Sequence, residues 1–373
     1  MTKNKVFITS TSSICCAGEN NTELFNNIIN SKSGISRETD FFYNSKPAIG
    51  KIKSDKTFYE NLNIQCQNIL NDSELENFHD TLLIVGSSVG GMKYTEDSFF
   101  KTSNYKEIDS TQHGIDTTKN ILNKNFNFYD DISFSTACTS SANAIGYAYE
   151  VLQKGIYKNA LVVGIDSLCQ TTVGGFLSLG VLSSNPCKPF DVNRDGMNVS
   201  EAIACLLLET TQKENSTEVC GVGYSSDAFH MTQPHPDGSQ TCMQNALNCA
   251  NIKYEQIDYI NAHGTGTIAN DTSEAQSIAK VFKNKPKVSS TKSITGHTLG
   301  AAGAIEAIIA DMVIQNQTIP TNTFLDDAQN KDINFSNETQ NSKVNYILSN
   351  SFAFGGNNCS LIFGKVEQNN NEY

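Results

Sequence analysis

The sequence has no apolar run long enough to cross a membrane, because no stretch reaches the roughly eighteen apolar residues that a transmembrane helix requires. Residues 1–13 pass directly into a strand-like run and lack the apolar core of a signal peptide. We therefore expect no membrane span and a cytoplasmic location. A length of 373 residues predicts two domains or one large fused fold.

An excess of positive charge and a metal-binding cysteine pattern are also missing. The net charge of −12 would repel a polyanion over most of the surface, so no nucleic-acid partner is expected. An acidic protein partner would need a local basic patch against this background. The eleven cysteines are scattered, odd in number and free of C-x-x-C pairs, which predicts buried free thiols and no metal site.

Strand-like and helix-like segments alternate along the chain, which predicts an α/β fold with buried sheets. A polar connection at 210–218 suggests two halves, 1–209 and 219–373. Asp271 and Glu274 resemble a capping box at the start of a helix. Segments 36–80 and 320–343 are polar excursions without a predicted fold, and the tail 366–373 is expected to fray. The predicted strands are 81–88, 131–136, 159–166, 201–209, 256–262 and 345–354, and the predicted helices are 140–155, 272–282 and 300–317.

Cys138 lies in a turn of small residues, 135–146, between a predicted strand and a predicted helix. Unpaired N–H groups and the positive end of the helix dipole would lower the pKa of a thiol placed there. A buried structural cysteine at a tight junction is the alternative, and this segment alone does not decide between them.

Two histidines occupy comparable turns in the second half. His263 follows a predicted strand, and Thr265 and Thr267 beside it offer hydroxyls to a polar chain. His297 precedes a helix rich in small residues, with Lys292 before it and Glu306 after it. A nearby ammonium disfavours imidazolium and would keep His297 neutral, and Glu306 could pair with Lys292. The alternatives are a histidine satisfied by loop backbone and an ion pair at a helix entry.

A fourth segment, 350–360, ends a strand in a Gly-Gly turn. Phe354, Gly355 and Gly356 suit a loop that presents a backbone N–H to an oxyanion, although an ordinary turn has the same residues. Cys359 is interpreted as structural. One cysteine and two histidines, each in a small-residue turn after a buried strand, together indicate a nucleophile with two polarising groups.

These segments resemble the β-ketoacyl-acyl-carrier-protein synthases, in particular the elongating Cys-His-His subclass of the thiolase-fold condensing enzymes. Segment 163–184 is similar to ketosynthases of aryl-polyene pathways. The motifs that carry the likeness are GSSVGG (86–91), TACTSS (136–141), GGF (174–176), KPFDVNRDG (188–196), SSDAFHMT (225–232), AHGTGT (262–267), TKSITGH (291–297), GAAGAIEA (300–307) and SFAFGGNN (351–358).

The resemblance implies a five-layered αβαβα thiolase fold of two topologically similar halves. It implies decarboxylative Claisen condensation of an acyl-carrier-protein primer with malonyl-carrier protein, in fatty-acid, polyketide or aryl-polyene synthesis. No cofactor is implied beyond the carrier's phosphopantetheine, and the implied partners are acyl carrier protein and a second subunit, in a homodimer or a heterodimer with a related ketosynthase-like chain. The implied roles are nucleophile (Cys138), its histidine partners (His263, His297), a supporting pair (Lys292, Glu306), an oxyanion hole and gate (Cys138, Phe354) and substrate contacts (Thr265, Thr267, Phe176, Gly355).

The sequence departs from this family at several places. Gly180 stands where relatives often carry an arginine, and the basic helix expected before GSSVGG is replaced by the acidic segment 60–80. Thiolase is a rival, but Cys359 lacks the Cys-x-Gly context that a thiolase needs, and a Cys-His-Asn enzyme would not have His297. A non-catalytic, chain-length-determining partner subunit is the alternative function. It would be expected to lack the nucleophile.

Overall fold

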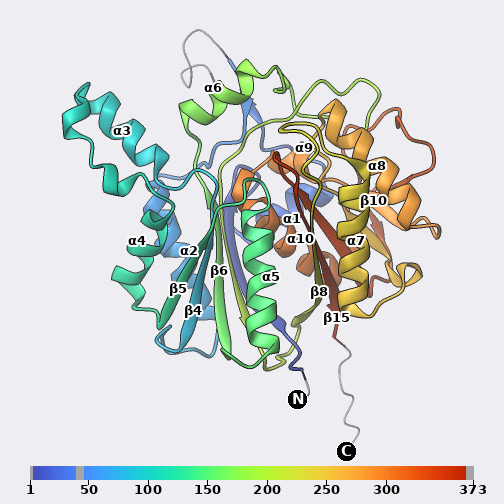
Figure 1. Cartoon of the computed structure of the whole chain (residues 1–373), viewed down its shortest axis with the longest axis horizontal. Helices are drawn as coiled ribbons and strands as arrows, with labels where there is room; N and C mark the ends of the chain where they lie inside the picture. The colour runs from blue at the N-terminus through green and yellow to red at the C-terminus, as the bar shows by residue number, and fades with distance from the viewer. Residues whose placement is uncertain (1–2, 39–45, 367–373) are drawn as a thin grey trace, which may run out of the picture.

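The computed structural model describes residues 3–38 and 46–366. Its main sheet has the strand order β12-β10-β9-β14-β15-β8-β1-β7-β6-β4-β5. Helices cover the outer faces of this sheet, and further helices lie between its two halves (Figure 1). The first half contains β1 (Phe7–Cys15), α1 (Asn21–Ile29), β2 (Ser36–Arg37), β3 (Ala48–Ile49), α2 (Phe58–Asp72), β4 (Thr81–Gly86), α3 (Met92–Thr102), η1 (Tyr105–Glu107), η2 (Ser110–Gln112), α4 (Asp116–Phe126), β5 (Asp130–Phe134), α5 (Ser140–Gln153), β6 (Asn159–Asp166), α6 (Gln170–Ser178) and β7 (Ala202–Glu209).

The second half repeats the pattern of strands. It contains β8 (Thr217–Ser226), α7 (Pro236–Ala250), η3 (Tyr254–Gln256), β9 (Tyr259–Asn261), α8 (Ile268–Val281), β10 (Lys287–Ser289), α9 (Lys292–Thr295), η4 (Leu299–Ala301), α10 (Ala302–Asn316), β11 (Thr318–Ile319), β12 (Asn334–Phe335), β13 (Gln340–Asn341), β14 (Tyr346–Phe352) and β15 (Asn357–Lys365).

The two halves have the same topology. In the first, β4 pairs in parallel with β5 and β6, and β7 pairs antiparallel with β6 and β1. In the second, β9 pairs in parallel with β10 and β14, and β15 pairs antiparallel with β14 and β8. Short antiparallel pairing between β1 and β8 joins them. Because one sheet runs through both halves, the predicted division at 209 and 219 stays a prediction.

Five layers follow from the faces that each strand buries. Successive side chains of a strand point to opposite faces. On β7, Leu206 packs into the central core and Leu207 into the outer core of the first half; on β15, Leu361 and Ile362 divide in the same way in the second half. α5 and α10 fill the central layer, α2 and α4 cover the outer face of one half, and α7 and α8 cover the other (Figure 1). The predicted αβαβα fold is confirmed.

The central helices approach each other closely because their contact residues are small. A Cβ added at Gly303 of α10 would lie 2.5 Å from the backbone nitrogen of Ala142 of α5. The Oγ of Ser141 also accepts the N–H of Ala304 at 2.9 Å. This contact fixes the N-terminus of α5 against the N-terminus of α10, and the catalytic candidates lie next to those two ends.

Several predictions need correction. Segment 36–80 contains α2, and β15 was not predicted. Asp271 and Glu274 form no capping box, because they lie within α8, which begins at Ile268. One stretch of described residues, Leu299–Asn316, is long and apolar enough to cross a membrane, contrary to expectation; it is 78% buried inside the protein, as a core helix is. The tail 366–373 lies almost wholly outside the described residues.

The contact between the central helices is testable by a matched pair of substitutions. Gly303→Ala should lower the free energy of unfolding by about 1–3 kcal/mol, because the added methyl overpacks the contact with Ala142. Gly175→Ala in α6 is the control: no atom lies within 4 Å of its added Cβ, and stability should stay the same or rise by about 1 kcal/mol. Urea unfolding measures both, and equal effects would contradict the packing argument.

Candidate active site

Cys138 lies in a sharp turn between β5 and α5. The preceding residue, Ala137, has a φ of 53°, a backbone conformation that costs a non-glycine residue energy and recurs at functional sites. The turn is closed by the N–H of Ser140, which donates to the carbonyl of Ala137 at 3.1 Å. Cys138 as a whole is 9% exposed. The structure therefore confirms that Cys138 lies between a strand and a helix, as predicted.

His263 follows β9 and is 2% exposed. The carboxylate of Glu274 holds its backbone, accepting the N–H of His263 and that of Gly264, each at 2.8 Å. The Nζ of Lys292 lies 3.4 Å from its Nδ1. Burial, the Lys292 ammonium and His297 together lower the pKa of His263 well below its usual range, so the ring is neutral at neutral pH.

His297 lies between α9 and η4 and is equally buried. Its backbone N–H donates to the carbonyl of Asn198 at 2.7 Å. Its Nδ1 accepts the N–H of Leu299 at 3.2 Å. Burial, helped by the Lys292 ammonium, lowers the pKa of His297 well below its usual range. The sequence predicted a neutral His297 from Lys292 alone, but burial lowers the pKa of His297 more than the ammonium does.

The environment of the two rings fixes their tautomers. The Nδ1 of His297 accepts a hydrogen bond, so the proton of this neutral ring is on Nε2. The Nδ1 of His263 faces the ammonium of Lys292, a donor, which places its proton on Nε2 as well. The ring centroids are 5.2 Å apart and the rings are nearly perpendicular. The site therefore offers two adjacent N–H donors without a positive charge on either ring.

Lys292 and Glu306 form a buried ion pair behind the histidines, as predicted. The side chains are 1% and 4% exposed. Burial raises the pKa of Glu306, and the Lys292 ammonium opposes this shift. A buried charge requires a partner, and each of these groups supplies one for the other.

The pKa of the Cys138 thiol differs from the prediction. Burial raises the pKa of Cys138 to about 12, although the Lys292 ammonium acts in the opposite direction. The sequence predicted a lowered pKa because the N-terminus of α5 follows the thiol, but desolvation of the thiolate is the larger effect. Cys138 is thus an uncharged thiol before substrate arrives.

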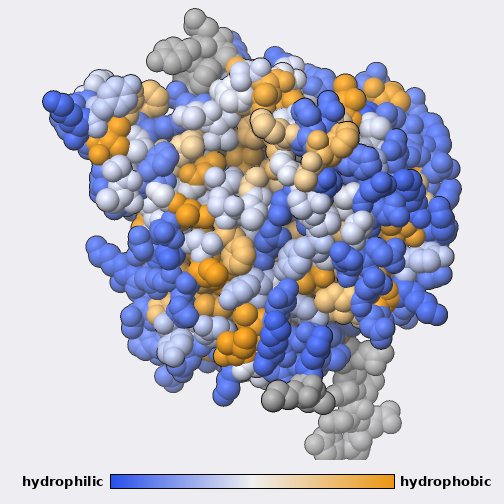
Figure 2. All heavy atoms as spheres, in the orientation of Figure 1, coloured by the Kyte–Doolittle hydropathy of each residue, from blue (hydrophilic) through white to orange (hydrophobic). Residues whose placement is uncertain are grey.

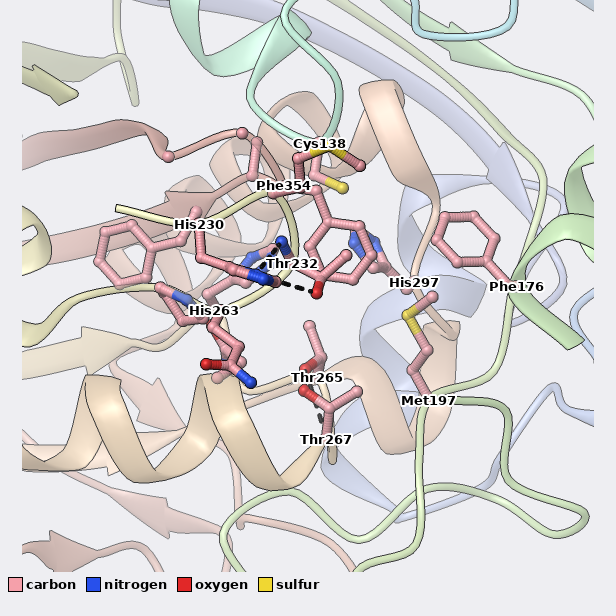
Figure 3. A pocket seen from close by; sticks show the side chains of 18 residues that line it. Cys138, Phe176, Met197, His230, Thr232, His263, Thr265, Thr267, His297 and Phe354 are labelled. Carbon is pink, nitrogen blue, oxygen red and sulfur yellow. Dashed lines mark hydrogen bonds between the residues drawn. The ribbon is translucent and has the colours of Figure 1, made fainter. Parts of the chain in front are cut away.

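Nearly all the predicted site residues line one pocket (Figure 3). Phe354 lies beside the thiol, 36% exposed, with its ring centroid 6.1 Å from that of Phe176. Gly355 donates its N–H to the carbonyl of Met231 at 2.9 Å, which ties this loop to the one after β8. Figure 2 shows apolar surface gathered around a hollow beside α6. The lining residues from the predicted set are Cys138, Phe176, His263, Thr265, Thr267, His297, Phe354 and Gly355.

The two threonines form the polar wall of this pocket. Their hydroxyls are 2.9 Å apart, and the N–H of Thr267 donates to the Oγ1 of Thr265 at 3.3 Å. Thr265 is buried and Thr267 is half-buried at the start of α8. The two hydroxyls predicted to face a polar chain therefore lie together on the pocket wall.

Sequence reasoning missed three positioning residues and part of the wall. Glu274, at the base of the His263 loop, has its pKa raised to about 7 by burial. Asp166 accepts the N–H groups of Ser88 and Gly300. Asn357 accepts hydrogen bonds from the Thr139 hydroxyl and the Asn143 amide, linking the thiol turn to the Phe354 loop. Residues 230–234 also line the pocket. Their partners are distant in sequence, so no local pattern indicated them.

Comparison with known proteins agrees with this geometry. Residues 60–214 match the N-terminal domain of β-ketoacyl synthase and residues 216–326 match its C-terminal domain. The chain is 32% identical to 3-oxoacyl-[acyl-carrier-protein] synthase 2 of Coxiella burnetii over 413 aligned positions, covering 98% of this chain and 100% of that one. This chain belongs to the β-ketoacyl synthase family.

Other relatives extend the comparison. The chloroplastic 3-oxoacyl-[acyl-carrier-protein] synthase II of Arabidopsis thaliana is 36% identical over 306 positions, or 75% of this chain and 57% of that one. A ketosynthase, ApeO, solved in complex with its chain length factor, ApeC, from Xenorhabdus doucetiae superposes with a TM-score of 0.88 at 27% identity, covering 97% and 98% of the two chains. A β-ketoacyl synthase from Burkholderia phymatum gives 0.86 at 27% identity, with 98% and 100% covered.

The protonation state of Cys138 is testable by alkylation. Because the pKa of the thiol is raised, its reaction with iodoacetamide should rise by roughly tenfold per pH unit between about pH 6 and about pH 9, without a plateau. Peptide mass spectrometry follows Cys138, and the exposed Cys249 reports the reagent's behaviour in the same sample. A plateau at Cys138 near neutral pH would show that the α5 terminus outweighs burial.

Proposed function

We infer that this β-ketoacyl synthase catalyses the decarboxylative condensation of an acyl-carrier-protein thioester with malonyl-carrier protein to give a 3-oxoacyl-carrier protein. The observation that carries this conclusion is one buried thiol in the same pocket as two neutral imidazoles whose Nε2–H groups are donors. A thiol accepts the acyl group, and uncharged donors stabilise an enolate without protonating it.

The first half-reaction is acyl transfer to Cys138. The sulfur attacks the thioester carbonyl, and the backbone N–H groups of Cys138 and Phe354 are proposed to hold the oxyanion. The carbonyl re-forms as the carrier's sulfur leaves, and the proton of the Cys138 thiol passes to that sulfur. An uncharged resting thiol fits this exchange, because the proton that must be lost is the one that the leaving group takes up.

The second half-reaction uses the histidines. They donate hydrogen bonds from Nε2 to the thioester carbonyl of the malonyl group, while its carbon–carboxylate bond breaks and carbon dioxide leaves. The electron pair forms an enolate, whose carbon attacks the acyl-cysteine carbonyl. The Cys138 sulfur leaves and takes a proton from solvent, and the product is two carbons longer than the primer.

Lys292 and Glu306 act through the histidines and are positioning residues in this scheme. The Lys292 ammonium adds to the effect of burial in keeping both rings unprotonated, and Glu306 balances its charge. Thr265 and Thr267 are proposed to bind the phosphopantetheine arm, and Phe176 and Gly355 to contact substrate at the pocket mouth.

The proposed partners are an acyl carrier protein and a second subunit. As the carrier-protein contact we propose a cleft of about 550 Å³ that is lined by four lysines, Lys51, Lys56, Lys93 and Lys101, against two acidic residues, Asp97 and Glu201. β5 ends the main sheet, and a free strand edge invites pairing with another chain. Solved neighbours include a ketosynthase with its chain length factor and a ketosynthase with its acyl-carrier protein. We propose that the second subunit is either another copy of this chain or a related ketosynthase-like chain, and that the pathway is of the aryl-polyene type. We also propose a cytoplasmic location, which the eleven free cysteines support.

The nucleophile is tested by separating the two half-reactions. Cys138→Ala should lower condensation by about 10⁴-fold or more, because no acyl acceptor remains. It should retain malonyl decarboxylation, since both histidines are intact. Radiolabelled acyl transfer and carbon dioxide release measure the two steps. Cys359→Ala, a buried cysteine on β15, is the control and should acylate like the wild type. An unlabelled wild type would instead favour the non-catalytic subunit.

The role of Lys292 is tested by the pH dependence of condensation. Lys292→Met should raise the pKa of both histidines, so activity should fall by about tenfold for each pH unit below the new pKa. The wild type should keep its activity to lower pH, because its histidines protonate only well below their usual range. Lys292→Met/Glu306→Leu removes the orphaned carboxylate as well, and Lys331→Met alters only an exposed pair. If the wild type and the three variants lose activity over the same range of acidic pH, Lys292 does not have this role.

A further inference from the structure

The cavity at Cys138 is too small for an acyl chain. Its volume is about 40 Å³, which is room for only a few water molecules at about 10–15 Å³ each. An acyl group longer than a few carbons cannot fit unless a side chain of the wall moves. The side chain that moves then decides how long a chain the enzyme accepts.

One side of the pocket wall borders a cluster of buried apolar side chains. Met197 lines the pocket and also belongs to a buried apolar cluster, here called the side cluster, against which Phe176 packs. The opposite side, with His263, His297 and Thr265, is polar and serves the carrier arm. An acyl chain therefore lies best toward the side cluster. Its members are Ile49, Val89, Leu168, Cys169, Val173, Met197, Val199 and Leu299.

The backbone of Met197 is held by hydrogen bonds, and its buried side chain is a flexible one. Its N–H donates to the carbonyl of Val181 at 2.9 Å, and its carbonyl accepts the N–H of Ser183 at 2.9 Å. The next residue, Asn198, accepts the backbone N–H of His297. Methionine has three rotatable side-chain bonds and adapts to irregular space. The Met197 side chain can therefore swing without displacing the catalytic histidine.

We propose that Met197 is a specificity-determining residue, whose side chain closes the way from the Cys138 thiol into the side cluster and sets the length of acyl chain that the enzyme accepts. Figure 3 shows the thioether between His297 and the Phe176 ring, pointing toward that ring. This inference rests on the proposed acyl transfer to Cys138, because the ligand is the acyl group of the acyl-enzyme. It adds the residue that selects among such groups.

The test is acylation of the full chain by a series of acyl-carrier-protein thioesters from butyryl to palmitoyl, followed by intact mass spectrometry. Met197→Ala should raise the ratio of palmitoyl to butyryl transfer by about tenfold or more, because it opens the side cluster. Met197→Phe should lower that ratio by about the same factor, because a rigid ring replaces a flexible chain. Peptide mapping confirms Cys138 as the acylated residue.

Met92→Ala is the matched control. Met92 packs against the same side cluster from α3 but does not line the pocket, so its removal should leave the ratio unchanged. Ratios within about twofold of wild type in both Met197 variants would overturn the inference, as would an equal effect of Met92→Ala. If Met197→Ala does not fold, Met197→Phe and Met197→Leu decide by the same criterion. A wild type that accepts no acyl group would contradict the proposed function itself.

Discussion

The close packing of α5 against α10 is the constraint on which the site depends. Each half of the chain supplies one of these helices, and each helix begins next to a catalytic candidate: the Cys138 turn precedes α5, and His297 lies just before η4 and α10. Small residues at the contact, Gly303 against Ala142, let the two backbones approach. A thiol and an imidazole from distant parts of the sequence then face one pocket. A bulkier contact would separate the nucleophile from the groups that polarise its second substrate.

Burial is the main reason why the thiol and the two imidazoles of this site are uncharged. Desolvation lowers the pKa of both histidines and raises that of the thiol, so all three are uncharged. The Lys292 ammonium beside the histidines is paired with Glu306. Uncharged groups need less solvation, which allows a dry pocket where hydrogen bonds to a developing enolate are strong. The same burial costs the thiol its reactivity as a free anion, and acyl transfer must therefore move its proton as it proceeds.

The sequence predicted the parts of the fold that have a strong local pattern. The apolar run 159–166 became β6 with the same bounds, and Gly155 follows α5 with a φ of 70°, as a helix-ending glycine does. α2 was missed because its fully buried apolar residues, Leu62, Cys66 and Ile69, are few and lie among many polar ones. For the site, Cys138, His263 and His297 were found from small-residue turns after strands. Glu274 and Asn357 were not, because their partners come from other elements, and desolvation of Cys138 depends on neighbours that no local pattern reveals.

The central claim is that two uncharged imidazoles, each protonated on Nε2, face the nucleophile. Nitrogen-15 NMR of histidine-labelled protein measures this directly, since the shifts of Nδ1 and Nε2 distinguish both tautomers from imidazolium. The account predicts that His263 and His297, assigned by His→Asn variants, remain neutral Nε2–H tautomers from about pH 8 down to about pH 5.5, below the ordinary histidine pKa of about 6.5. Titration of either ring near pH 6.5, or a proton on Nδ1, would contradict it.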